Sequence, residues 1–197
     1  MIHFIIATFP EAKSFIKFYK LKKLLSLTEF ETYINKRKKI TLTISGIGKL
    51  LSACSVVFTN SYFKNKNNIW INIGLGGIKN TNIGKLYLIN KIIDKENDLK
   101  FYPFFLFKTN IEKKQCKTFN KPNFSYSNSV HDMEVSGFYL ACTKFSTNEL
   151  IHSFKIISDN KNKRINFKNI DEVSSLMEKN IEKIDKFIYK LKNKAEV

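Results

Sequence analysis

Three carboxylates in this sequence stand beside apolar segments, where solvated surface acids would not be expected. Glu11 comes soon after the apolar run 2–7, Asp159 follows the apolar run 151–158, and Glu134 stands at the mouth of an apolar helical segment. Carboxylates can activate water, stabilise positive charge on a substrate or protonate a leaving group. We therefore interpret Glu11, Glu134 and Asp159 as candidates for one catalytic site.

Each acid also has a structural interpretation. Glu11 stands behind Pro10 in the first turn of a predicted helix, and Glu134 could be an ordinary helix-start acid, since the helix dipole favours both. Asp159 could form an Asx turn after its strand. We interpret Asp132 as a helix cap, because aspartate is a favoured N-cap residue. For the three candidate acids, we favour function over these alternatives.

A glycine-rich stretch, NIGLGG at residues 72–77, ends the apolar run 69–74. We expect a turn here, with Gly74 and Gly76 at the substrate, because glycine lets a ligand approach the backbone. The spacing does not match the GxGxxG pattern of dinucleotide sites, and no acidic residue stands clearly about 20 residues later. No cofactor is therefore expected.

Predicted strands and helices alternate along the chain. Strands are expected at 2–7, 29–35, 39–45, 69–74, 85–93, 99–107, 114–119 and 151–158. Helices are expected at 10–21, 132–146 and 170–192, and another is opened by GIGK at 46–49. This alternation predicts one α/β domain over residues 1–197, a three-layer mixed twisted sheet flanked by helices. Ligands of such folds bind beyond the carboxyl ends of the strands, where the three acids would meet.

Two helices have apolar faces that we expect to be buried. The first follows GIGK at 46–49, and its expected core face comprises Leu50, Leu51, Ala53, Cys54, Val57 and Phe58. The last starts with Asn169 followed by Glu172, a capping-box pattern. Its apolar stripe comprises Leu176, Ile184, Phe187, Ile188 and Leu191.

Composition indicates a packed globular chain. The 197 residues are 43% hydrophobic and include 18 Phe, and no apolar run approaches the roughly 20 residues of a membrane helix. The start lacks the basic region and cleavage site of a secretory signal. Three distant cysteines and three isolated histidines, among them His131, predict neither disulfides nor a metal site. A reducing cytoplasm is the simplest location.

The formal net charge of +17 raises the question of nucleic-acid binding. The lysines are scattered, however, and no arginine–aromatic interleaving marks a surface for stacking bases. Lys, Asn, Ile and Phe are abundant together, and their codons are rich in A and T, so genome composition alone explains the bias. We expect a small-molecule ligand and neither a nucleic-acid nor a membrane partner.

Four motifs in order, GIGK (46–49), NIGLGG (72–77), DMEVSG (132–137) and ISD (157–159), resemble those of the nucleoside phosphorylase superfamily. Among its branches the chain looks most like the 5′-methylthioadenosine/S-adenosylhomocysteine nucleosidases. The resemblance covers nearly the whole chain. It implies a twisted mixed sheet with flanking helices, which agrees with the alternation of elements.

The resemblance also implies a role for each candidate residue. Glu134 would hold the ribose 2′ and 3′ hydroxyls while Met133 packs under the sugar. Asp159 would protonate or hydrogen-bond N7 of the purine, and Glu11 would activate the attacking water. These roles suit the chemistry, because cleavage of an N-glycosidic bond builds positive charge on the sugar and negative charge on the base.

The chain departs from the family pattern in three places. The segment between about 95 and 130, where relatives place base-stacking residues, is shortened, and Phe119 or Phe124 would replace them. Leu75 stands where relatives often have a phosphate- or water-binding hydroxyl. Lys155 stands where an anion-binding arginine is common, and lysine lacks the bidentate fork of arginine. These changes weaken a phosphorylase interpretation more than a hydrolase one.

The sequence thus predicts a purine nucleosidase that releases free base and sugar from an adenine nucleoside. A phosphate-dependent phosphorylase and an inactive nucleoside-binding protein are the alternatives. Because family members usually complete the pocket with a neighbouring subunit, we expect a homodimer.

Overall fold

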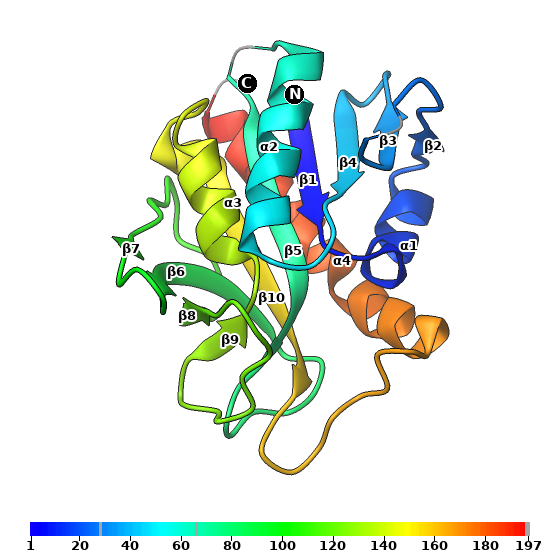
Figure 1. Ribbon diagram of the computed structural model, residues 1–197. Helices are drawn as coiled ribbons and strands as arrows, with labels where there is room; N and C mark the ends of the chain where they lie inside the picture. Colours follow the sequence, from blue (N-terminus) through cyan, green and yellow to red (C-terminus); the bar gives the residue numbers. More distant parts are fainter. Residues whose placement is uncertain (28, 66, 196–197) are drawn as a thin grey trace.

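The structure is a computed structural model that describes residues 1–27, 29–65 and 67–195, and it places a twisted sheet between two pairs of helices (Figure 1). The strands are β1 (Ile2–Ile6), β2 (Lys22–Lys23), β3 (Thr32–Asn35), β4 (Ile40–Ile44), β5 (Ile69–Gly77), β6 (Leu86–Asp94), β7 (Lys100–Phe101), β8 (Lys113–Thr118), β9 (Val130–Asp132) and β10 (Ile151–Asp159). The helices are α1 (Phe9–Phe18), α2 (Lys49–Phe63), α3 (Val135–Cys142), the 3₁₀ turn η1 (Asn148–Leu150) and α4 (Ile170–Lys194).

Strand β5 is the centre of the sheet, because it pairs with β1, β9 and β10. On one side the sheet continues from β1 through β4 and β3 to β2. On the other side β10, β6, β8 and β9 lead back to β5 and close a small ring of strands. Strands β1, β5 and β10 are parallel, so the segments that follow them meet at one edge.

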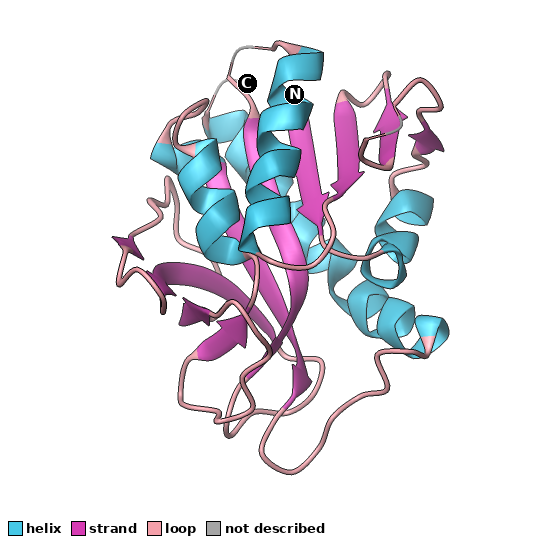
Figure 2. Cartoon of the chain, in the orientation of Figure 1, coloured by secondary structure: helices cyan, strands magenta, loops and turns pink. Residues whose placement is uncertain are grey.

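Helices cover both faces of the sheet, which gives the expected three-layer α/β architecture (Figure 2). On one face α2 and α3 pack together, and Val56, Val135 and Phe138 form a core with Trp70 of β5. On the other face α1 packs on α4. The expected stripe of α4 is buried there, and the Asn169 side chain caps the helix by accepting the N–H groups of Asp171 and Glu172.

The expected core face of α2 was wrong for four of its six residues. Leu50, Leu51, Cys54 and Val57 are exposed, Ala53 and Phe58 are partly buried, and the buried residues are Ser52, Ser55, Val56 and Thr59. The reason is the close approach of α3, where a Cβ on Gly137 would overlap the carbonyl oxygen of Lys49. At such short range small side chains fit between the elements, and the larger apolar ones are turned outward.

Several boundaries also differ from the prediction. The glycines of NIGLGG lie within β5, not in a turn, because the strand continues to Gly77 to pair with β9 and β10. Residues 130–132 form β9, so helix α3 begins only at Val135. The strand expected at 99–107 is reduced to β7. Among the described residues, no helix is long and apolar enough to cross a membrane.

Candidate active site

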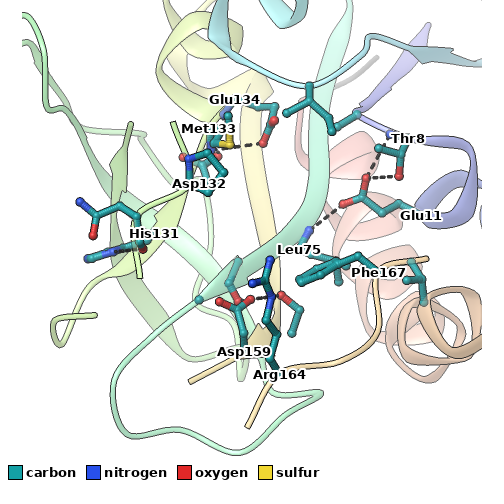
Figure 3. Close-up of a pocket in the computed structure, with 18 of the residues that line it drawn as sticks. Thr8, Glu11, Leu75, His131, Asp132, Met133, Glu134, Asp159, Arg164 and Phe167 are labelled. Atoms are coloured by element: carbon teal, nitrogen blue, oxygen red, sulfur yellow. Dashed lines mark hydrogen bonds between the residues drawn. The ribbon is translucent and has the colours of Figure 1, made fainter. Parts of the chain in front are cut away.

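A cavity of about 530 Å³ lies at the edge where β1, β5 and β10 end. Glu11, Gly76, Met133, Glu134 and Asp159 all line it, although they come from distant parts of the chain (Figure 3). The other two predicted residues, Gly74 and Lys155, do not line it, although the Lys155 Nζ atom lies 3.9 Å from Glu134 Oε2 and 3.1 Å from the point where a Cβ on Gly74 would be. The sheet therefore brings the predicted site residues together.

Glu11 is fixed by hydrogen bonds from two elements. Its Oε2 accepts the Thr8 backbone N–H at 3.0 Å and the Thr8 hydroxyl at 2.7 Å, and its Oε1 accepts the Leu75 N–H at 2.9 Å. The carboxylate thus caps α1, as the structural alternative expected, and it also faces the cavity. The same point beside Gly74 is 3.4 Å from Glu11 Oε1, so this carboxylate and the Lys155 ammonium both come close to the Gly74 backbone.

Glu134 is a buried acid that points into the cavity. Its Oε1 accepts the Gly48 N–H at 2.9 Å, and Gly48 has a φ of 107°, which favours glycine. Burial raises the pKa of Glu134 to about 7, although the nearby charge of Lys155 opposes the shift. Met133 lies beside it on the cavity wall. The acid at the mouth of the apolar helix is therefore buried at the cavity wall and is not a solvated surface acid.

Asp132 and Lys155 form a buried ion pair behind Glu134. The Lys155 Nζ lies 2.8 Å from Asp132 Oδ2 and 3.9 Å from Glu134 Oε2. Asp132 also accepts the Val135 N–H at 2.9 Å, so it caps α3 as expected, and the Thr118 hydroxyl at 2.7 Å. Burial opposes ionisation of Asp132, but Lys155 outweighs it and holds the aspartate pKa below its usual value.

The Lys155 ammonium lies within ion-pair distance of Asp132 but is poorly oriented for a hydrogen bond to it. The contact with Asp132 lacks hydrogen-bond geometry, and within the described part of the chain this buried nitrogen has no hydrogen-bond acceptor. The ammonium is therefore held by its charge attraction to Asp132, and it stays fully buried behind the cavity wall.

Asp159 stands at the end of β10 with both carboxylate oxygens occupied. Oδ1 accepts the Ser158 hydroxyl, and Oδ2 accepts the Tyr126 hydroxyl. The β-bridge between Asp159 and Arg164 ties the following loop to the strand end. A side chain that could serve as an acid is thus placed beside the phenol of Tyr126.

Aromatic side chains form the wall near Asp159. The guanidinium carbon of Arg164 lies 4.4 Å from the ring centroid of Phe124 and 4.9 Å from that of Phe167. Of the two expected stacking residues, Phe124 lines the cavity, whereas Phe119 is absent from the lining and packs on His131 with centroids 4.8 Å apart. His131, expected to be structural, also lines the wall.

Sequence reasoning missed Tyr126, Arg164 and Phe167. All three belong to segments without regular secondary structure, in which no periodicity marks an inward side chain. Phe167, three residues after Arg164, was the one aromatic signal near it in the sequence. Among the described residues, no cluster of His, Cys, Asp and Glu side chains has a metal-binding arrangement.

No protein-family model matches the sequence, and no curated protein matches it by sequence. Solved structures do match the fold. The 5′-methylthioadenosine nucleosidase of Arabidopsis thaliana in apo form has a TM-score of 0.76 at 14% identity, over 96% of this chain and 95% of that chain. The Campylobacter jejuni 5′-methylthioadenosine/S-adenosylhomocysteine nucleosidase has a TM-score of 0.75 at 16% identity, over 96% and 98%.

A futalosine hydrolase mutant of Helicobacter pylori strain 26695 is also similar, with a TM-score of 0.71 at 12% identity, over 96% of this chain and 98% of that chain. Because these sequence identities are low, the matches show a shared fold and do not assign site residues to this chain. The chain has the fold of the 5′-methylthioadenosine/S-adenosylhomocysteine nucleosidases.

Proposed function

We propose that the protein, as one domain over residues 1–197, is a purine nucleosidase that hydrolyses the N-glycosidic bond of an adenine nucleoside. The substrate is like methylthioadenosine or adenosylhomocysteine. The observation that carries this proposal is the convergence of Glu11, Glu134 and Asp159 on one cavity. Each acid acts on a different reacting group, namely the sugar, the water or the base.

At the sugar, Glu134 accepts the ribose hydroxyls and Met133 packs beneath the ring. The Gly48 N–H holds the carboxylate in place for this contact. As the bond between C1′ and the base lengthens, positive charge develops on the sugar, and the negative carboxylate stabilises it. The ionised form of Glu134 is therefore the active one.

The attacking water binds in the cavity beside the Glu11 carboxylate. Glu11 accepts a proton from the water while the water oxygen bonds to C1′. The positive charge of Lys155, which pairs with Asp132, helps to orient the water oxygen. Gly74 and Gly76 contribute to the site because no side chain fills the space at these positions.

At the base, Asp159 donates a proton or a hydrogen bond to N7 as the bond to C1′ breaks. The electron pair of that bond goes to the purine, and protonation neutralises the developing negative charge. Phe124 provides the ring on which the base stacks. Products are free base and sugar, with no cofactor required.

A substrate panel tests this function. Adenosine, methylthioadenosine, adenosylhomocysteine, inosine and futalosine are incubated with the protein, with and without phosphate, and released base is measured by chromatography. We expect adenine release without phosphate. Strict dependence on phosphate would assign the protein to the phosphorylases, for which the unpartnered Lys155 ammonium is the favouring observation. Thermal stabilisation by nucleosides without release of base would indicate an inactive binding protein.

The protein acts as a cytoplasmic homodimer in this proposal. Ile47 lines the cavity and is 58% exposed, and it continues into the outward face of α2, where Leu50 and Leu51 are 77% and 46% exposed. A second copy would cover this apolar face next to the cavity. Light scattering tests the assembly, and a monomeric mass would contradict it.

A further inference from the structure

The end of the cavity at Asp159 is occupied by a side chain of the protein itself. Tyr126 lies in the irregular segment between β8 and β9, and its hydroxyl donates to Asp159 Oδ2. Ser158 takes the other carboxylate oxygen. Both oxygens of the proposed acid are therefore engaged before any base arrives.

The ring of Tyr126 also fills the space beside Asp159. A Cβ on Gly77 would overlap the Tyr126 ring and Asp159 Oδ2 at once, so the ring lies directly against the backbone of β5. Gly77 is the residue of β5 that pairs with Asp159. A purine that approaches Asp159 Oδ2 in the plane of its carboxylate would meet the phenol there.

We propose that Tyr126 competes with the purine base for Asp159, so that nucleoside binding requires the phenol to leave the carboxylate. This inference rests on the proposed function, because it takes Asp159 as the partner of the base. It assigns a further residue that sets affinity for the base. Tyr126 belongs to the segment that carries Phe124, so its displacement and stacking of the base on Phe124 are linked.

If Tyr126 competes with the base, removing this competition should lower the apparent Kd for the base. When the binding-competent conformation is only fractionally populated, the apparent Kd is the intrinsic Kd divided by that fraction. Removal of the phenol hydroxyl removes a hydrogen bond to a charged acceptor that favours the closed conformation. If the closed form is favoured by about ten to one, its loss tightens binding by up to about 10-fold.

The test compares Tyr126→Phe with the wild-type protein. Adenine binding is measured by calorimetry, and KM and kcat are measured with methylthioadenosine. We expect the Kd for adenine and KM to fall by about 3- to 10-fold with kcat within about twofold, while Tm of the ligand-free protein falls slightly. A merely structural tyrosine would lower Tm without tightening adenine binding. Tyr189→Phe is the matched control, because Tyr189 is 67% exposed on α4 and absent from the cavity lining.

Two results would overturn the inference about Tyr126 and leave the proposed function intact. Equal or weaker adenine binding by Tyr126→Phe would show that the phenol does not compete. A loss of kcat above about 10-fold would make the phenol a partner in catalysis. If neither protein binds adenine or cleaves a nucleoside, the proposed function fails as well, and the two failures are thereby distinguished.

Discussion

At the scale of single residues, Glu11 has a structural role beside the chemical one that we propose. Its Oε2 caps α1 through Thr8, while its Oε1 accepts the Leu75 N–H at the cavity wall. The cap fixes the carboxylate without using its capacity to take a proton. An acid that the sequence pattern presents as a helix-start residue can therefore also be a base.

Glu11→Gln tests this double role. We expect kcat to fall by about 10²- to 10⁴-fold, because the amide keeps the shape but cannot take the proton of the water, while ligand binding changes little. Steady-state kinetics and calorimetry measure the two effects. Glu31→Gln, which changes an exposed acid paired with Lys23, is the matched control. If Glu11→Gln stays active while Asp159→Asn is inactive, the water is activated elsewhere.

Glu134→Gln tests the buried acid of the ribose site. The folded-state pKa of about 7 lies above the ordinary glutamate pKa of 4.5, so between these values the folded protein holds a proton that the unfolded chain has lost. Stability therefore falls as pH rises through this window, and above pH 7 the ionised Glu134 destabilises the free protein.

We expect Glu134→Gln to stabilise the ligand-free protein at pH 8 by on the order of 1–3 kcal/mol and to have little effect near pH 4.5. The same substitution should weaken nucleoside binding at pH 8, because the ribose hydroxyls lose a charged acceptor. Urea denaturation and calorimetry at both pH values measure the two effects. Equal stability of both proteins at pH 8 would contradict the buried-charge explanation.

At the scale of elements, the site depends on how closely α2 approaches α3. Lys49, the first residue of α2, donates to both oxygens of Asp94 at 2.8 Å, and Asp94 also accepts the Ser136 hydroxyl of α3 at 2.8 Å. This contact fixes Gly48, whose N–H holds Glu134. The two helices therefore position Glu134, which we propose accepts the ribose hydroxyls.

Gly137→Ala should disturb this arrangement. The new Cβ would overlap the Lys49 carbonyl oxygen, so α2 and α3 must separate. We expect a loss of about 1–3 kcal/mol in the free energy of unfolding and weaker nucleoside binding, because the Gly48 N–H moves with α2. Urea denaturation and calorimetry measure both, with Leu140→Ala on the exposed side of α3 as the control. Unchanged nucleoside binding would show that α2 does not position Glu134.

The same contact explains what the sequence could and could not predict. The order of strands and helices, the position of Glu11 after β1 and the cap at Asn169 are local signals, and the structure agrees with them. The outward face of α2 follows from the tertiary contact at Gly137, which no helical periodicity reveals. Likewise, Tyr126 and Arg164 reach the cavity from irregular segments, where sequence patterns give no direction.

At the scale of the whole molecule, two buried histidines make stability depend on pH. Burial lowers the pKa of His3 to about 3 and that of His152 to about 4. The unfolded chain protonates these rings near pH 6.5, whereas the folded protein keeps them neutral. Their contribution is therefore fully present above about pH 6.5 and is lost as the pH falls toward these lower values.

We expect the free energy of unfolding to fall between pH 7 and pH 4.5 in urea denaturation experiments on Glu134→Gln, which lacks the opposite contribution of Glu134 over the same window. Repulsion within a chain of net charge +17 would act in the same direction, but salt screens it. Repeating the titration at 0.5 M salt separates the two causes, since the buried rings do not respond to screening. A pH dependence that disappears in salt would assign the effect to surface charge.

The closed ring of strands has a consequence for the behaviour of the protein at high concentration. Within the described chain, the sheet ends at β2 and β7, each only two residues long and each containing lysine: Lys22–Lys23 and Lys100–Phe101. Short, positively charged edges repel one another and offer few free backbone groups for pairing between molecules. The folded protein should therefore resist fibril formation by edge-to-edge association.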